Sequence, residues 1–229
     1  MSLAGLLLAT ALLQGNASAA LLWPDVSSNQ ILRYARTDRV MAPFNHTIEG
    51  AITVKISAAD TSQIDWTETL LHRESGRSQA DPPFQLLSGG AMTEGGGAAD
   101  ARIRPFYNPA LLGSLPATLR AGLSWTMRFT DLNNQFAAPG TATIHVSRVD
   151  TAARRVEFTI DFDGSSNRQL TNPMAAGVVS MDIHKRAHAT AVFTNGILSS
   201  WHESGTLLER TAGSPAHSVN YDVTDILLR

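Results

Sequence analysis

Three histidines, His184, His188 and His202, and an acid, Glu203, lie close together near the C-terminal end of the chain. On a helix, His184 and His188 would stand one turn apart on the same face, a spacing that suits two ligands of one metal ion. Whether these residues could bind a metal therefore depends on whether the stretch forms a helix or a strand.

The polarity of this stretch alternates from residue to residue. Odd positions over 179–193 are apolar except Lys185, and even positions over 180–194 are polar except Val192. A period of two is that of a strand with one apolar face. We therefore predict a long strand here, followed by a two-residue type I′ turn at Asn195-Gly196.

A strand changes what the histidines can do. Four residues of strand separate His184 from His188 by ~13 Å, too far to share one ion. Continued from the turn, the pairing would place His188 opposite Glu203 and turn His202 to the other face. The candidate ligand or partner surface is formed by this hairpin and one further predicted strand, and its residues are His202, Trp201, His188, Glu203 and Trp125.

Motifs of common enzymes and metal sites are missing. The chain has no G-x-S-x-G, and the H-E-x-x-H motif that His202-Glu203 would begin has Thr206 in place of its second histidine. Residues 161–167 alternate oxygen-bearing side chains but lack the closing Glu of an EF-hand, so we interpret them as a turn, with calcium as the alternative. We predict no catalytic residue, no cofactor and no metal.

Alternation recurs along the chain and sets the fold class. It is clear over residues 48–56, 123–129, 155–163 and 219–223. Half-buried antiparallel strands have this pattern. We predict an all-β protein of about ten strands, built as an antiparallel sandwich or as an open or half barrel.

The chain also resembles itself. Residues 50–83 align without gaps onto residues 140–173, and each copy is predicted to form a hairpin with its turn at an Asp-Thr pair. Chance similarity of two hairpins is the alternative. We expect two similar β-rich halves, 20–113 and 114–229, joined by a short helical connector that begins at Asn108-Pro109. Within the first half, the Gly-rich residues 74–100 lack periodicity and are expected to be a flexible loop or a lid.

The N-terminus has the pattern of a secretory signal. Residues 3–13 are apolar apart from Gly5 and Thr10, and this run is shorter than the ~20 residues that span a bilayer. The small residues Ala17-Ser18-Ala19 follow, so we predict a signal peptide over 1–19, cleaved after Ala19. A membrane-attached or buried helix is the alternative. The mature protein is expected to be secreted or periplasmic, with no stable transmembrane segment.

Composition narrows the function without naming it. The chain has 229 residues, no cysteine and a formal net charge of −2, which excludes thiolate chemistry and argues against a nucleic-acid partner. Amphipathic strands without catalytic motifs favour a binding or carrier module for a lipid or other apolar molecule, or for an envelope protein. The alternative is an envelope hydrolase that acts on glycan or polymer.

Overall fold

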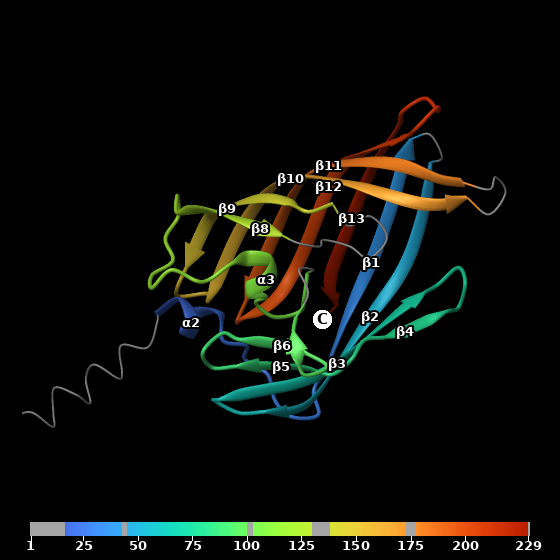
Figure 1. Cartoon of the computed structure of the whole chain (residues 1–229). Helices are drawn as coiled ribbons and strands as arrows, with labels where there is room; N and C mark the ends of the chain where they lie inside the picture. Colours follow the sequence, from blue (N-terminus) through green and yellow to red (C-terminus); the bar gives the residue numbers. More distant parts are fainter. Residues whose placement is uncertain (1–16, 43–44, 100–102, 130–137, 173–176, 229) are drawn as a thin grey trace, which may run out of the picture.

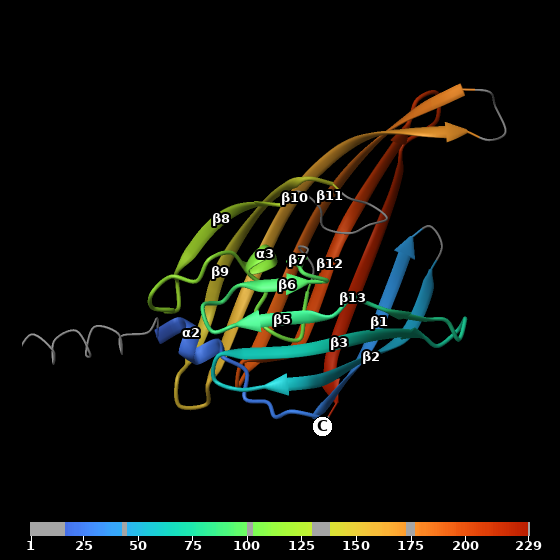
Figure 2. The same cartoon turned by 60° about the horizontal axis from the view of Figure 1, so that its bottom comes forward.

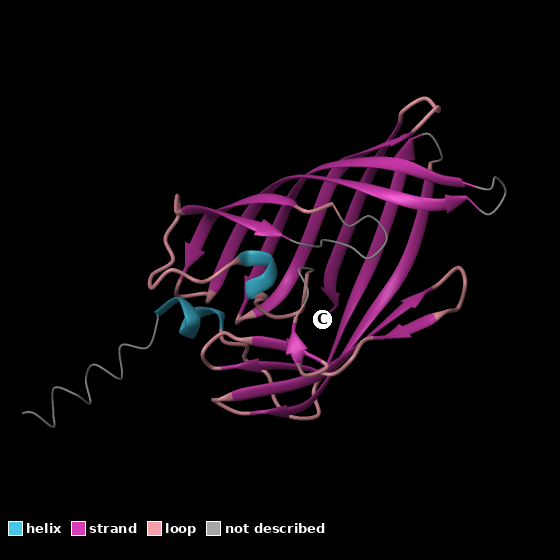
Figure 3. Cartoon of the chain, in the orientation of Figure 1, coloured by secondary structure: helices cyan, strands magenta, loops and turns pink. Residues whose placement is uncertain are grey.

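The protein is built from antiparallel strands (Figures 1 and 3). A computed structural model describes residues 17–42, 45–99, 103–129, 138–172 and 177–228. In these ranges the strands form one open sheet of thirteen, together with two short helices, α2 (Ala17–Leu22) and α3 (Pro109–Leu112). The predicted all-β class is confirmed, and the strands outnumber the expected ten.

The strands are long in the middle of the sheet and short at one edge. In chain order they are β1 (Ile31–Ala42), β2 (His46–Ala59), β3 (Gln63–His72), β4 (Ser78–Ala80), β5 (Phe84–Leu87), β6 (Met92–Glu94), β7 (Gly97–Ala98), β8 (Ser124–Phe129), β9 (Gly140–Asp150), β10 (Arg155–Asn172), β11 (Gly177–Thr194), β12 (Ile197–Thr211) and β13 (His217–Leu228). Their order across the sheet is β7-β6-β5-β3-β2-β1-β13-β12-β11-β10-β9-β8, and β4 pairs with β3.

The two predicted halves of the chain occupy the two sides of this single sheet. Strands β1 to β7 form one side and β8 to β13 the other, and the halves meet where β1 pairs with β13. Figure 2 shows the sheet curving so that β8 and the β5–β6 edge approach α3 from opposite sides. We call the face of the sheet turned toward α3 the inner face.

The inner face carries the apolar core. Trp66 stacks on Phe84 and meets Phe106 edge-on at a centroid distance of 4.7 Å, and all three side chains are fully buried. On the same face, in the half of the sheet formed by β8 to β13, Phe158 and Phe193 form a second edge-on pair. In β3, β9 and β10 alternate residues are buried on this face, as the period of two predicts.

The helical connector forms as predicted, over one turn. Asn108 caps α3 by accepting a hydrogen bond from the Ala110 amide, and Pro109 opens the helix. The indole Nε1 of Trp125, on β8, donates to the Leu112 carbonyl at 2.9 Å. Gly113 ends the helix with a φ of 80°, and a Cβ there would lie 2.7 Å from the same Nε1. Trp125 thus fastens α3 to the sheet.

The segment expected to be one long loop is ordered differently. Residues 74–100 contribute the short strands β4 to β7, which extend the sheet beyond β3. Gly90 and Gly95 adopt positive φ values in the turns between them. Short strands joined by glycine turns show no sustained alternation, which is why periodicity missed them.

The two aligned hairpins resemble each other in their first strand and in their turn. Asp60 accepts from the Ser62 hydroxyl and from the amides of Ser62 and Gln63, and these hydrogen bonds lower the Asp60 pKa. Asp150 accepts from the amide of Ala153. Each hairpin has a β-bulge in its first strand, at Ser57 in one and at the aligned Ser147 in the other.

The second strands of these hairpins do not follow the gapless alignment. Ile56 pairs with Trp66, but its counterpart Val146 pairs with Phe158, two residues further than the alignment requires. Duplication of the hairpin stays a prediction.

Most of the predicted signal peptide, residues 1–16, lies outside the described residues. Leu22 of α2 is 3% exposed and belongs to the core. Ser18, on the N-terminal side of the predicted cleavage point, is 1% exposed, and cleavage after Ala19 stays a prediction. Across the parts of the chain that the structure describes, no helix combines the length and apolar character needed to cross a membrane.

The close packing of neighbouring atoms around Gly164, on β10, can be tested by a substitution. Gly164 pairs with Gly140, and a Cβ added to Gly164 would lie 2.5 Å from both the Ala138 carbonyl oxygen and the Phe162 ring. We expect Gly164→Ala to destabilise the protein by ~1–3 kcal/mol, which lowers the melting temperature by several degrees. Gly89→Ala, where a Cβ meets nothing within 4 Å, is the matched control. Equal melting temperatures for the two variants in thermal denaturation would contradict the steric argument.

Candidate functional site

A bulge in β12 decides which side chains share a face. The Asn195-Gly196 turn is formed as predicted, with φ values of 53° and 73°. Two pairs beyond it, Ser199 is left without a partner on β11, so the register slips by one residue. Because successive side chains of a strand point to opposite faces, a slip of one residue moves each β12 side chain beyond the bulge to the face opposite to the predicted one. His188 therefore faces Ser204, and the predicted His188–Glu203 pair is wrong.

The five predicted site residues are divided between the two faces. Glu203 and Trp201 lie on the inner face near the β1–β13 seam, whereas Trp125 lies on the same face but far off, beside α3. His188 and His202 both lie on the outer face, so the prediction that His202 points to the face opposite His188 is also wrong. There, His188 Nδ1 contacts Asp161 at 2.7 Å, and His202 hydrogen-bonds Asp222.

Around Glu203 the inner face holds ionisable groups that sequence reasoning missed. We call this group the seam cluster, because its members come from β1 and β13 and from the adjacent β11 and β12. They are Arg36, Asp38, Lys185, Glu203, Tyr221 and Asp225.

Glu203 is held from two neighbouring strands. It accepts a hydrogen bond from Tyr221 Oη at 2.6 Å and pairs with Lys185 Nζ at 2.9 Å. Lys185 Nζ also lies 5.2 Å from the centre of the Tyr221 ring, a cation–π distance. Gly205 makes room for this ring, since a Cβ there would lie 2.6 Å from Tyr221 Oη.

Arg36 joins the two halves of the sheet. Its Nε contacts both carboxylate oxygens of Asp38 at 3.1 Å, and its Nη1 lies 3.4 Å from Asp225 Oδ2 on β13. The other oxygen of Asp225, Oδ1, is buried and has no hydrogen-bond partner. Burial raises the pKa of Asp225 to about 6; Arg36 opposes the shift, and Asp38 and Glu203 add to it.

Tyr34, also on β1, presents a second buried polar atom. Its side chain is 2% exposed, and its hydroxyl has no hydrogen-bond partner. Burial raises the pKa of this hydroxyl, as do the nearby charges of Glu68 and Asp225, so the group is a neutral phenol. Buried polar atoms are nearly always hydrogen-bonded in native proteins, so two such atoms on one face are a departure that needs a cause.

Beyond the packed core, the inner face stays half-exposed and mixed in character. Val40, Ile48 and Leu70 are only half-buried and lie on the same face as Arg36. The ionised side chains among them are also partly exposed, at 24% for Arg36 and 19% for Glu203. Apolar surface thus borders the seam cluster.

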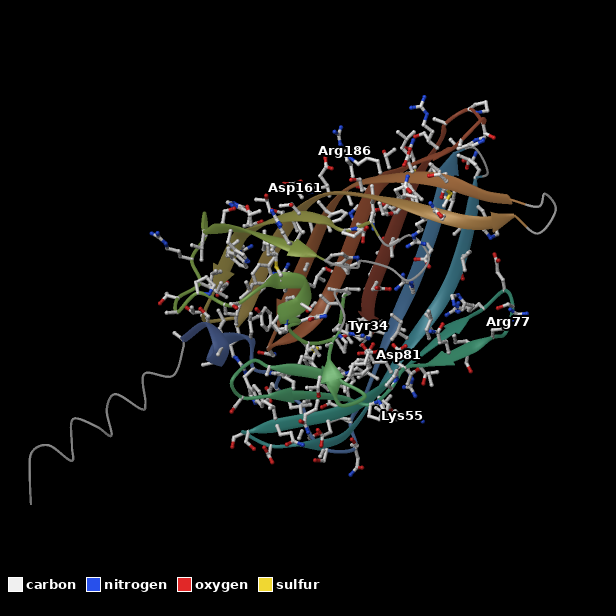
Figure 4. The ribbon with its side chains drawn as sticks, viewed as in Figure 1. Tyr34, Lys55, Arg77, Asp81, Asp161 and Arg186 are labelled. Atoms are coloured by element: carbon white, nitrogen blue, oxygen red, sulfur yellow. The ribbon has the colours of Figure 1, made fainter. Side chains whose placement is uncertain are left out.

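A separate buried ion cluster holds the short strands in place. Arg104 is 1% exposed and contacts Glu94 at 2.8 Å, with Glu68 and Asp81 at longer range. Its guanidinium also lies 4.1 Å from the centre of the Phe84 ring. These contacts join β3, β6 and the segment before α3, so the cluster has a structural role. Figure 4 shows Asp81 and Tyr34 inside the curve of the sheet.

The outer face has an open depression of about 530 Å³. Figure 4 shows two of its residues, Asp161 and Arg186, on the side of the sheet away from Tyr34. Its polar lining consists of Thr141, Thr143, Asp161, Asp163, Arg186, His188, Ser204 and Thr206.

His184 and His188, on this face, each contact a single aspartate. Asp163 contacts His184 Nε2 at 2.8 Å and Arg186 Nε at 3.0 Å, and these two partners lower its pKa. His188 pairs instead with Asp161. Within the described ranges, no three His, Asp or Glu side chains are grouped as metal ligands.

Comparison with known proteins finds no matching family model and no matching curated protein. The chemistry of the two faces is therefore the basis for assigning a function.

The raised pKa of Asp225 makes stability depend on pH. Below about pH 4 this carboxyl is protonated whether the chain is folded or unfolded, so protonation costs folding nothing there. Between about pH 4 and 6 the folded protein binds more protons than the unfolded chain, so stability falls as pH rises. Two pKa units correspond to about 3 kcal/mol.

Asp225→Asn mimics the protonated form and should remove this pH dependence. We expect the variant to become more stable relative to the wild type, by a few kcal/mol, as pH is raised from about 4 to 7. Urea denaturation of both proteins across this window measures the difference. A stability difference that does not change with pH would show that Asp225 titrates normally.

Proposed function

We propose that the protein binds a lipid or another molecule with an apolar chain on its inner face, as a carrier or binding module. The observation that carries the proposal is the pair of buried, unpartnered polar atoms, Asp225 Oδ1 and Tyr34 Oη, beside half-exposed apolar side chains. Leaving such an atom without a partner costs ~1–3 kcal/mol. A bound molecule with a polar end and an apolar body offsets this cost.

The apolar body has a defined place in this proposal. Val40, Ile48 and Leu70 flank the seam cluster and do not belong to the packed core. Sites for small molecules combine mostly apolar walls with a few convergent polar groups. An envelope protein that covers the same surface is the other form of the binding hypothesis, and it would bury the same residues.

Adjacent leucines on β3 provide a matched test. Leu70 faces inward, whereas Leu71 faces outward and is 40% exposed. We expect Leu70→Asn to weaken binding of the neutral apolar fluorophore N-phenyl-1-naphthylamine by ~3- to 10-fold, because a half-buried leucine contact is lost. Leu71→Asn should leave the affinity unchanged.

Fluorescence titration measures this affinity, and native mass spectrometry of protein purified from its own cells should show an apolar adduct. Failure of the wild type to bind the fluorophore, together with the absence of an adduct, would overturn the carrier proposal.

A second candidate, an envelope hydrolase, is favoured by one observation on the outer face. Asp161, His188 and Ser204 are cross-strand neighbours in one row, and all three line the depression. Asp161 contacts His188 Nδ1, which leaves Nε2 as the nitrogen available to a serine. This order of groups is that of a Ser-His-Asp triad, so the reaction would be acyl transfer on an ester-linked glycan or polymer.

Covalent labelling tests this candidate directly. A fluorophosphonate reacts with an activated serine, so under this hypothesis it should label Ser204, and His188→Ala should reduce labelling by at least ~100-fold because the base is lost. Ser200, on the same strand, provides the control, since Ser200→Ala should be labelled like the wild type. Peptide mass mapping that finds no label on Ser204 would remove the hydrolase hypothesis.

A further inference from the structure

The seam cluster contains an odd number of charges. Its cations are Arg36 and Lys185, and its acids are Asp38, Glu203 and Asp225. Full ionisation leaves one negative charge in excess within a partly buried environment, where charge is expensive. A ligand can remove that excess if it brings a positive charge.

Both cations are already committed to particular acids. Arg36 Nε donates to the carboxylate of Asp38, and Arg36 Nη1 lies 3.4 Å from Asp225 Oδ2. Lys185 pairs with Glu203 at 2.9 Å. The acceptor that remains is Asp225 Oδ1, on a side chain that is 2% exposed and has no hydrogen-bond partner at this oxygen.

We propose that the seam cluster is the head-group site of the ligand, and that the head group is a primary amine. The proposal rests on the proposed function and identifies the ligand class as a long-chain amine. Its ammonium donates to Asp225 Oδ1, while a second N–H donates to Tyr34 Oη. The apolar chain then follows the half-exposed inner face toward Leu70.

The neighbours of Asp225 suit an ammonium. In the sheet register Asp225 lies between Arg36 on β1 and Trp201 on β12, whose side chain is buried in the packed core. Ammonium groups are attracted to carboxylates. The predicted site residues Trp201 and Glu203 thus both belong to this side of the sheet.

An anionic head group would have the opposite electrostatics. A carboxylate or phosphate would add a further negative charge to Asp38, Glu203 and Asp225 and would have to displace an existing ion pair. A neutral hydroxyl could satisfy the two free atoms but would leave the excess charge in place. The amine is the class that both completes the hydrogen bonds and balances the charge.

Three probes with the same ten-carbon chain test the head group. Calorimetric titration of the wild type at neutral pH should show n-decylamine binding about 10- to 100-fold more tightly than decanoate or 1-decanol, the range of one charge-assisted hydrogen bond. Equal or tighter binding of decanoate or decanol would overturn the amine proposal and leave the carrier proposal standing. Binding of none of the three would overturn both.

Two aspartates on β13 provide matched variants. Asp225→Asn should reduce decylamine affinity to the level of decanol, whereas Asp222→Asn, three residues away on the outer face, should bind decylamine like the wild type. Circular dichroism confirms that each variant is folded. A decylamine preference that survives Asp225→Asn would overturn the assignment of Asp225, and the wild-type comparison decides the head-group class even where a variant fails to fold.

Discussion

The pairing of β1 with β13 holds the two halves of the chain in one sheet, and the seam cluster depends on it. Arg36 and Asp225 are 189 residues apart in the sequence and lie opposite each other in this register. Without that pairing, the acids of β13 would have no cation from β1. The site is therefore a product of the longest-range contact in the sheet, and anything that weakens the seam weakens the site.

The curvature of the sheet explains why polar atoms on its inner face are costly. A single sheet has two faces, and here the inner one carries the aromatic core around Trp66 and Phe158. Polar groups placed on the same face lose their water, as the raised pKa of Asp225 and of Tyr34 indicates. Ionic partners recover part of that loss within the seam cluster, but Asp225 Oδ1 and Tyr34 Oη gain no such partner.

Local patterns in the sequence predicted the strands well, because a period of two is a property of each segment alone. The strand around His184 and His188, the Asn195-Gly196 turn and the Asn108 cap were all confirmed. Pairing between distant strands leaves no such local mark, so the seam cluster could not be found. The bulge at Ser199 then turned the following β12 side chains to the opposite face from the predicted one, and it made the predicted partner of His188 wrong.

The same reversal separates the two candidate functions onto opposite faces. It moves Glu203 inward to Lys185 and Tyr221, and it places Ser204 beside His188 on the outer face. Burial distinguishes what the faces can do, because His188 and Asp161 are 56% and 72% exposed, and water competes for every interaction there. Asp225 is shielded from water, so a single contact to its free oxygen is worth far more. The inner face is consequently the stronger basis for recognition.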